Sequence, residues 1–204
     1  MFRLKGGSRD EPAGKSSSVK VITVRVDNIE FAYLIEDEKV VEIFRFHDFN
    51  DLHRALEDRG VDIQGLRINE DEGWILTLNR FTRGVFSGRP ASPPPHALRG
   101  VTPFQRRVLE LTRLIPPGRF TTYGELGKPF SPRHGRAVGQ VMAMNPLPFI
   151  IPCHRVLASN LRLGGFGLGL EVKRGLLRAE KGASRRVPRN LPFKTYSVEI
   201  LPYL

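Results

Sequence analysis

The chain has 204 residues, a formal net charge of +11 and one cysteine. This length suffices for one large domain or two small ones, which argues against disorder of the chain as a whole. A single cysteine excludes an internal disulfide framework and any zinc site that needs two thiolates. No apolar run approaches the roughly 20 residues that span a bilayer, and the first residues are polar, so we expect a soluble intracellular protein.

The excess positive charge lies entirely in the second half. Residues 1–100 contain 15 Lys and Arg against 16 Asp and Glu, a net of −1, whereas residues 101–204 contain 17 against 5, a net of +12. A basic half beside a neutral one indicates a polyanionic partner that is bound through phosphate neutralisation. The Arg-rich, solvated surface of a heat-adapted protein is the alternative that charge leaves open.

The first half is expected to be a small α+β unit after a flexible leader, residues 1–18. Stretches rich in β-branched and aromatic residues predict an antiparallel meander over residues 19–26, 29–35 and 40–46, with turns at Asp27-Asn28 and Asp37-Glu38. Asn50 is expected to cap a short helix over residues 50–59, and Gly60 to end it. Residues 74–78 fit a strand or a helix equally.

Proline marks the boundary between the halves. Four prolines occupy the six residues 90–95, a composition incompatible with a helix or a central strand. We interpret residues 89–100 as an interdomain linker.

The second half is predicted to be helical. Thr102-Pro103 supplies an N-cap and a first-turn proline for a helix that Pro116-Pro117-Gly118 ends. Thr122 and Glu125 match a capping box, which predicts a second, short helix. Ser131-Pro132 is expected to cap a third helix over residues 133–144. Two helices joined closely in a basic domain suggest a helix-turn-helix with residues 133–144 as the recognition helix, although most helical hairpins are structural.

The third helix carries almost no side chain on one face, because Gly135, Gly139 and Ala143 recur every four residues. A glycine inside a helix costs roughly 1 kcal/mol relative to alanine, so the backbone is expected to approach something closely. A neighbouring helix is one candidate, and a DNA groove too narrow for bulky side chains is the other.

The most informative stretch is residues 148–156, PFIIPCHRV, which places Cys153 at a proline-set bend beyond an apolar segment. An isolated cysteine is most often inert packing. The adjacent His154 and Arg155 favour chemistry instead, because a base or a positive charge raises the thiolate fraction of a cysteine. His154 is the candidate base, acting directly or through a bridging water. Glu180, in a helix expected over residues 171–181, is the acid chosen to hold its tautomer.

These residues together resemble the O6-alkylguanine-DNA alkyltransferases, the methylated-DNA–protein-cysteine methyltransferase family. The matching segments cover most of residues 102–182 in the family's order and spacing: TTYGEL at 121–126, GRAVG at 135–139, Asn145-Pro146, PCHRV at 152–156 and residues 170–180. The resemblance implies two domains, an N-terminal RNase H-like α+β unit and a mostly α unit with a winged-type helix-turn-helix. It places these at residues 19–88 and 101–182, followed by an extension over residues 183–204.

The resemblance also implies roles for individual residues. Cys153 would accept the alkyl group in a single turnover, and a water, His154 and Glu180 would generate its thiolate. Tyr123 would help protonate the leaving base, and Asn145 would brace the active-site loop. Arg136 would fill the gap left by the flipped nucleotide. The remaining DNA-binding residues would be Gly135, Ala137, Gly139, Gln140, Gln105 and Ser159, and the remaining pocket residues Met142, Val156, Phe166 and Gly167.

The resemblance further implies duplex DNA with O6-alkylguanine, and O4-alkylthymine as a second lesion, as the partner of a monomeric protein in the cytoplasm or nucleoid, with no cofactor and no metal. Phe166 and Gly167 depart from the Tyr and Ser of many members, which leaves the range of alkyl groups open. Two other functions compete. A non-catalytic lesion-binding module is disfavoured because relatives of that kind lack the cysteine, and a cysteine hydrolase is disfavoured because no GxCxG-like elbow surrounds Cys153.

Overall fold

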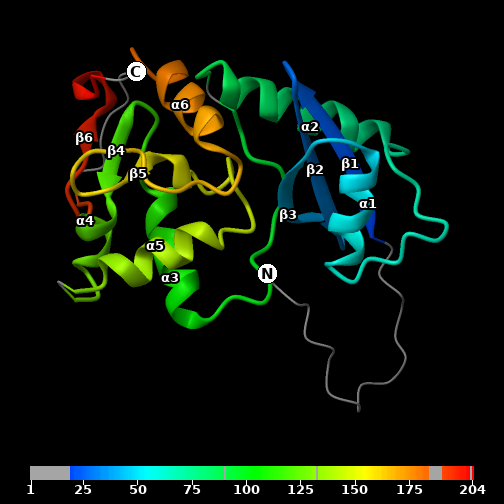
Figure 1. Ribbon diagram of the computed structural model, residues 1–204, viewed down its shortest axis with the longest axis horizontal. Helices are drawn as coiled ribbons and strands as arrows, with labels where there is room; N and C mark the ends of the chain where they lie inside the picture. The colour runs from blue at the N-terminus through cyan, green and yellow to red at the C-terminus, as the bar shows by residue number, and fades with distance from the viewer. Residues whose placement is uncertain (1–18, 90, 132, 184–189, 203) are drawn as a thin grey trace.

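The computed structural model describes residues 19–89, 91–131, 133–183, 190–202 and 204. The predicted leader, Pro90, Pro132 and part of the C-terminal extension therefore lie outside the described residues. The fold is mixed α/β and contains two small sheets, each of which lies in one half of the chain (Figure 1). Within the described ranges, no helix is long and apolar enough to cross a bilayer.

The first sheet is the predicted meander. Its strands β1 (Lys20–Val26), β2 (Ile29–Glu36) and β3 (Lys39–Phe46) pair antiparallel in chain order. Both connections are tight, and Asp27, Asp37 and Glu38 adopt positive φ there, as two-residue hairpin turns require.

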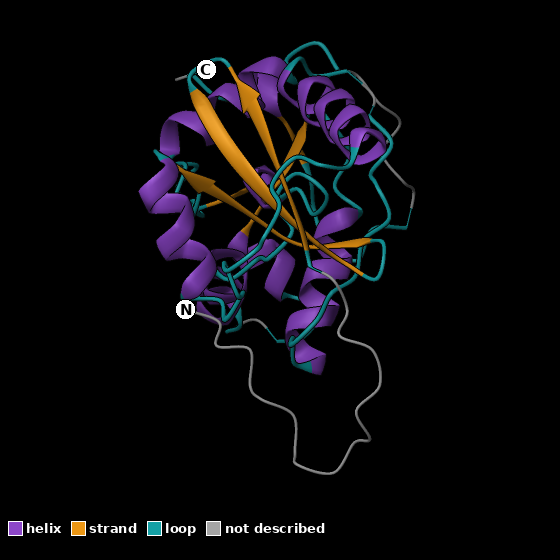
Figure 2. Cartoon of the chain, turned by 90° about the vertical axis from the view of Figure 1, so that its right-hand side faces the viewer, coloured by secondary structure: helices purple, strands orange, loops and turns teal. Residues whose placement is uncertain are grey.

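Helices cover both faces of this sheet. Figure 2 views the molecule from the side on which the sheet lies. Helix α1 (Phe49–Glu57) packs Leu52 and Leu56 on one face, and helix α2 (Glu72–Phe86) packs Trp74 and Leu78 on the other. The prediction that Asn50 caps the first helix is wrong. Asp48 is the N-cap, and its carboxylate accepts a hydrogen bond from the backbone N–H of Asp51. The undecided residues 74–78 belong to α2.

The predicted linker lies along the edge of the first sheet. The backbone N–H of Val40 donates to the Pro95 carbonyl at 2.9 Å, and the N–H of Ala97 donates to the Val40 carbonyl at 3.0 Å. Described residues of the linker thus pair with the outer edge of β3 in a short parallel bridge, which fixes the path of the chain between the halves.

The second half begins with α3 (Pro103–Arg113), whose capping box joins Thr102 to Gln105. It continues through β4 (Arg119–Thr122), α4 (Tyr123–Gly127), α5 (Gly135–Ala143), the 3-10 turn η1 (Cys153–Arg155), β5 (Val156–Leu157) and α6 (Leu170–Ala179). Strands β5 and β6 (Tyr196–Ser197) flank β4 in a sheet that the helical prediction missed, and η2 (Val198–Ile200) follows.

One predicted capping box is incomplete, and two helix termini differ from their predicted positions. Thr122 caps α4 as expected, but the Glu125 carboxylate binds Lys128 and does not complete a capping box. Helix α5 begins at Gly135 after His134, without a side-chain cap, because residues 133–134 form a turn closed by the His134 N–H and the Ser131 carbonyl. Helix α6 ends at Ala179, which makes Glu180 its C-cap.

One apolar core continues from the α2 face of the first sheet into the second half. Phe149 joins the two parts, since its ring meets the rings of Phe31 and Phe86 at centroid distances of 5.1 and 5.5 Å. Phe149 adopts a φ of +73°, which is uncommon for a bulky side chain and is held here by that packing. The segment that leads to Cys153 is therefore anchored on the first sheet.

Candidate active site around Cys153

Cys153 begins the 3-10 turn η1 and is only 4% exposed. The apolar segment before it is folded back on itself, because the Ile151 N–H donates to the Leu147 carbonyl at 2.8 Å. Cys153 belongs to the apolar core, and it also lines an open groove.

Asn145 touches the sulfur directly. Its Nδ2 donates to Cys153 Sγ at 3.0 Å and to the Ile151 carbonyl at 3.0 Å, while its Oδ1 accepts from the Leu147 N–H at 3.1 Å. Burial raises the pKa of the Cys153 thiol, and the hydrogen bond from Asn145 and the charge of Lys173 oppose that rise. The resting thiol therefore needs a base before it can attack.

His154 and Glu180 form a buried pair behind the cysteine. Glu180 Oε1 lies 3.0 Å from His154 Nε2, and both residues are almost fully buried. His154 Nδ1 is buried and has no hydrogen-bond partner among the described residues. Burial lowers the pKa of His154 even though Glu180 opposes this, so the ring is neutral near pH 7. A neutral ring that donates from Nε2 keeps an acceptor at Nδ1.

Among the described residues, no side-chain hydrogen bond joins Cys153 to His154: the thiol binds Asn145, and the imidazole binds Glu180. The bridging-water route of the sequence analysis is the one compatible with this geometry.

Arg155 points at Glu180 and not at the cysteine, contrary to the expectation that it would act on the thiol. Its Nε and Nη2 bind Glu180 Oε1 at 3.0 and 2.7 Å, and its Nη1 donates to the Ile115 carbonyl at 2.7 Å. The Gly118 N–H adds a bond to Glu180 Oε2 at 3.1 Å. Burial by itself would raise the pKa of Glu180, but His154 and Arg155 outweigh it and hold the pKa at about 2. The carboxylate is therefore ionised.

Lys173 supplies a positive charge near the thiol that the sequence analysis missed. This fully buried residue donates from Nζ to the carbonyls of Val156 at 2.8 Å, Leu163 at 2.5 Å and Gly165 at 3.4 Å. Burial lowers its pKa to about 8, partly offset by the charge of Cys153. A lysine on the apolar face of α6, beside Val172, was the available signal.

Tyr123 stands above this lysine. Its ring centroid lies 5.9 Å from Lys173 Nζ, and its hydroxyl is 3.5 Å from the Gly165 carbonyl. Gly164 adopts a φ of +67° where a Cβ would lie 3.0 Å from the Tyr123 hydroxyl, so the loop and the ring fit closely. Burial raises the pKa of Tyr123, and the charge of Cys153 raises it further. The phenol stays protonated and can donate a proton.

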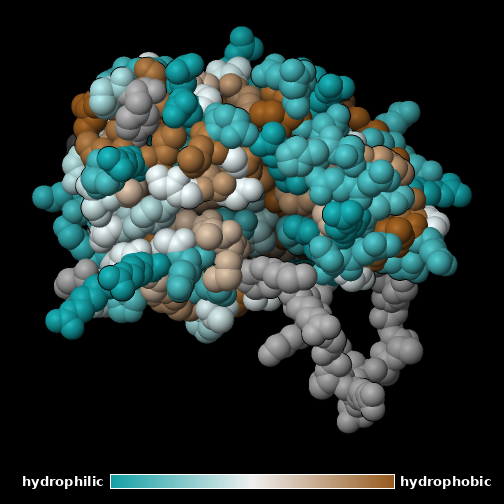
Figure 3. Space-filling view, in the orientation of Figure 1, coloured by the Kyte–Doolittle hydropathy of each residue, from teal (hydrophilic) through white to brown (hydrophobic). Residues whose placement is uncertain are grey.

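A groove of about 1230 Å³ opens onto the sulfur between the two halves. The space-filling view shows this hollow (Figure 3). Predicted pocket residues Met142, Phe166 and Gly167 line the groove, whereas Tyr123 and Val156 do not. The sequence analysis missed the contribution of the first half, since β3 supplies one wall through residues such as Val41, Ile43 and Arg45.

The predicted DNA-binding residues divide into two groups. Arg136 and Gln140 are exposed on α5, and a Cβ on Gly139 would meet nothing within 4 Å. In contrast, Gly135 packs on α4, where its Cβ would lie 3.5 Å from the Cα of Gly124. The face of α5 that carries Gly135 and Gly139 thus contacts α4 at Gly135 and is open at Gly139.

The other predicted contacts lie elsewhere. Ala137 is half-buried on α5, Ser159 is exposed beyond β5, and the Gln105 side chain accepts from the Thr102 N–H within the cap of α3. Among the described residues, no group of three His, Cys, Asp or Glu side chains could hold a metal ion.

Residues 103–182 match the family model described as "6-O-methylguanine DNA methyltransferase, DNA binding domain". A methylated-DNA–protein-cysteine methyltransferase of Haemophilus influenzae is 41% identical over 110 residues, which are 52% of this chain and 58% of that relative. The chain thus spans little more than half of that relative. The enzyme of the same name from Thermococcus gammatolerans is 48% identical over 123 residues, covering 60% of this chain and 69% of that protein.

Solved structures give the same picture over a longer stretch. The crystal structure of the Mycobacterium tuberculosis O6-methylguanine methyltransferase has a TM-score of 0.66 at 26% identity and covers 85% of this chain and 97% of that chain. The M. tuberculosis OGT in complex with DNA has a TM-score of 0.65, also at 26% identity, and covers 81% and 95%.

Proposed function

Because this chain belongs to the methylated-DNA–protein-cysteine methyltransferase family, we propose that it repairs DNA by transferring an alkyl group from O6 of guanine to Cys153. The observation that carries this proposal is the buried sulfur at the end of an open groove, with Asn145 on Sγ at 3.0 Å and the His154–Glu180 pair behind it.

The proposed reaction is a displacement at saturated carbon. His154 takes the thiol proton through a bridging water, and Glu180 stabilises the resulting imidazolium. The S–C bond forms as the C–O6 bond breaks, and the electron pair leaves on the base, which takes a proton from Tyr123. Asn145 and Lys173 stabilise the thiolate until it reacts. The transfer leaves His154 protonated and Tyr123 deprotonated, so the net charge is unchanged, and proton exchange with solvent restores both residues.

Single turnover follows from the product. To regenerate the thiol, a nucleophile would have to attack the alkyl carbon and displace the cysteine thiolate, which is a poor leaving group. Among the described residues, the groove supplies no such nucleophile. Each molecule therefore repairs one lesion, which is O6-alkylguanine or, as a second substrate, O4-alkylthymine.

Base flipping is required because a side-chain thiol cannot reach the target inside a duplex, and extrusion costs a few kcal/mol. We place α5 in the minor groove with Arg136 filling the gap, supported by the exposure of Arg136 and the open space at Gly139. Arg136→Ala is expected to slow repair of duplex DNA far more than reaction with a free alkylated base. Parallel losses in both assays would refute this role.

The domain architecture proposed with this function is an N-terminal RNase H-like unit, residues 19–88, and a winged-type helix-turn-helix unit, residues 101–182, in a monomer. The two small sheets and the α4–α5 pair are the features that support it.

The decisive test is mass spectrometry after incubation with a duplex that contains O6-methylguanine. We expect the peptide that contains Cys153 to gain one methyl group in proportion to the lesion repaired. An unmodified peptide despite DNA binding would support the lesion-binding module, and repeated turnover of an acyl substrate would support the hydrolase.

A further inference from the structure

We infer that Arg45, on the edge strand of the first sheet, is a positioning residue for alkyl transfer. Its side chain bonds the first half of the chain to the loop before α6, which contains Leu168 and lines the groove. This inference rests on the proposed function and assigns a role to the N-terminal unit, for which the sequence gives no function.

The contacts of Arg45 cross from one half to the other. Its Nη1 donates to the Leu168 carbonyl at 3.1 Å, and the same atom forms an ion pair with Glu171 in the first turn of α6. The Arg45 side chain is 23% exposed, so the bond to the carbonyl is partly shielded from water. Arg45 and Leu168 both line the groove that opens onto Cys153.

Gly169 shows how closely this contact is packed. It adopts a φ of +103°, and a Cβ there would lie 2.5 Å from Glu171 Oε1 and 2.8 Å from Arg45 Nη1. The positive φ favours glycine, and any larger residue would displace the ends of the Glu171 and Arg45 side chains. Gly169 is also the N-cap of α6, so Arg45 holds the start of the helix that carries Lys173.

Ile43, two residues before Arg45 on β3, makes a second connection, to the segment that carries Asn145. The backbone N–H of Ile43 donates to the Pro146 carbonyl at 2.8 Å, next to the Asn145 that binds the sulfur. The first sheet is thus bonded to two segments that line the groove together with Cys153. The Ile43 bond belongs to the backbone, whereas the Arg45 bond can be removed by substitution.

A purely stabilising ion pair is the competing explanation. Glu171 is 63% exposed, and ion pairs of that kind contribute little to stability. The hydrogen bond to Leu168 differs from the ion pair, because it holds a backbone carbonyl of the loop that lines the groove. Loss of the carbonyl bond and loss of the ion pair should therefore have different effects.

The experiment compares three variants of the full chain in single-turnover transfer from an O6-methylguanine duplex. Arg45→Ala removes both interactions, and Glu171→Gln removes only the ion pair. Arg25→Ala is the matched control, because Arg25 also contacts one carboxylate and one carbonyl, those of Glu30 and Asp27, but within the first sheet.

We expect Arg45→Ala to lower the transfer rate at saturating DNA about tenfold, a cost typical of a displaced reactive geometry, with the dissociation constant for undamaged DNA unchanged. Glu171→Gln and Arg25→Ala are expected to keep the wild-type rate. If Arg45→Ala does not fold, Arg45→Met, which keeps the apolar stem, replaces it.

Three outcomes would overturn the inference: an unchanged rate in Arg45→Ala, an equal loss in Glu171→Gln, or a parallel loss of DNA affinity. Failure of the proposed function is distinguishable, because the wild-type protein would then transfer no methyl group at all.

Discussion

The reactivity of Cys153 depends on how charge is divided among the few buried residues around it. Burial disfavours the thiolate, while Asn145 and Lys173 favour it. Arg155 contributes indirectly, since it keeps Glu180 ionised and so keeps His154 oriented with Nδ1 free. Cys153 is therefore a protonated thiol in the absence of substrate, and His154 is the base that can deprotonate it.

Substitution of Glu180 tests this arrangement. Glu180→Gln keeps the shape but removes the charge that stabilises protonated His154, so we expect the single-turnover transfer rate to fall on the order of 10- to 100-fold. DNA affinity, measured by fluorescence anisotropy with an unmodified duplex, should change much less. Equal losses of rate and affinity would indicate that Glu180 acts only in folding.

The same residue predicts a pH dependence of stability. The pKa of Glu180 lies at about 2 in the folded protein, below its ordinary value of 4.5. Between these values the unfolded chain binds more protons, so the free energy of unfolding falls as the pH drops from 4.5 towards 2. Urea unfolding at several pH values should show that the stability gap between wild type and Glu180→Gln narrows over this range. A gap that stays constant would contradict the assignment.

At the scale of elements, α5 combines two different uses of small residues. Gly135 packs on α4, where a Cβ would make an ordinary contact with Gly124 at 3.5 Å. Gly139 faces open space and costs helix stability without an internal contact that explains it. The proposed minor-groove contact supplies the explanation.

Gly139→Ala is expected to change the free energy of unfolding and the affinity for DNA in opposite directions. We expect the free energy of unfolding to rise by about 0.5–1 kcal/mol, because alanine is the better helix former and meets no neighbour, while affinity for duplex DNA falls. Gly175→Ala in α6 is the matched control, since its Cβ also meets nothing within 4 Å. It should gain similar stability and keep wild-type affinity. An unchanged affinity in Gly139→Ala would argue against the groove contact.

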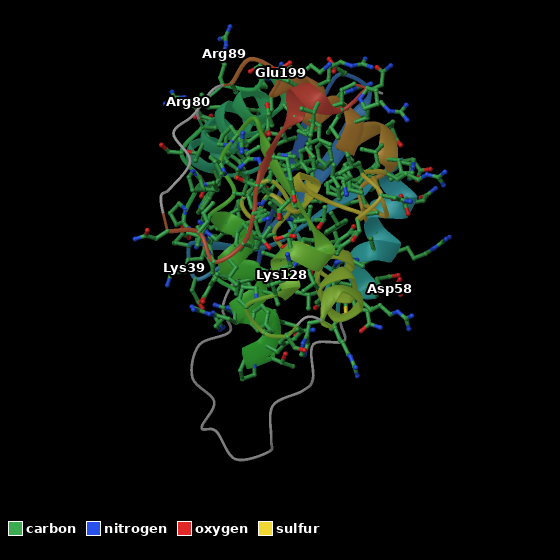
Figure 4. The ribbon with its side chains drawn as sticks, turned by 90° about the vertical axis from the view of Figure 1, so that its left-hand side faces the viewer. Lys39, Asp58, Arg80, Arg89, Lys128 and Glu199 are labelled. Carbon is green, nitrogen blue, oxygen red and sulfur yellow. The ribbon has the colours of Figure 1, made fainter. Side chains whose placement is uncertain are left out.

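At the scale of the whole molecule, the described part of the C-terminal extension packs on the body of the second half. Strand β6 pairs with β4, and Val198 and Leu201 are buried against Phe120 and Leu177. Glu199, labelled in Figure 4, accepts a hydrogen bond from the Gly182 N–H at 2.7 Å. These contacts support docking on the body of the second half as the role of the described part of the extension.

Two adjacent residues test that role. Leu201 is 1% exposed and Ile200 is 55% exposed. Leu201→Ala should lower the free energy of unfolding by about 2–5 kcal/mol, as buried leucines usually do, whereas Ile200→Ala should change it by less than about 0.5 kcal/mol. Chemical denaturation measures both, and similar small effects would mean that the extension is not part of the core.

The sequence predicted the elements whose signals are local. Stretches rich in β-branched and aromatic residues predicted the three strands of the first sheet, and Thr102-Pro103 predicted the start of α3. Where several polar residues compete for a cap, as Asp48 and Asn50 do before α1, local pattern selected the wrong one. Strand β4 was missed because its partners β5 and β6 are distant in the chain.

The sequence by itself determined the candidate reactive group and the family, since a lone cysteine in PCHRV and four further segments lie in the family's order and spacing. Only the tertiary structure decided which way the long side chains point. Arg155 turns to Glu180, Lys173 enters the site from α6, and Arg45 reaches it from the first sheet. The physical reason is that neighbours along the chain set the backbone locally, whereas the partner of a flexible charged side chain depends on which distant elements pack beside it.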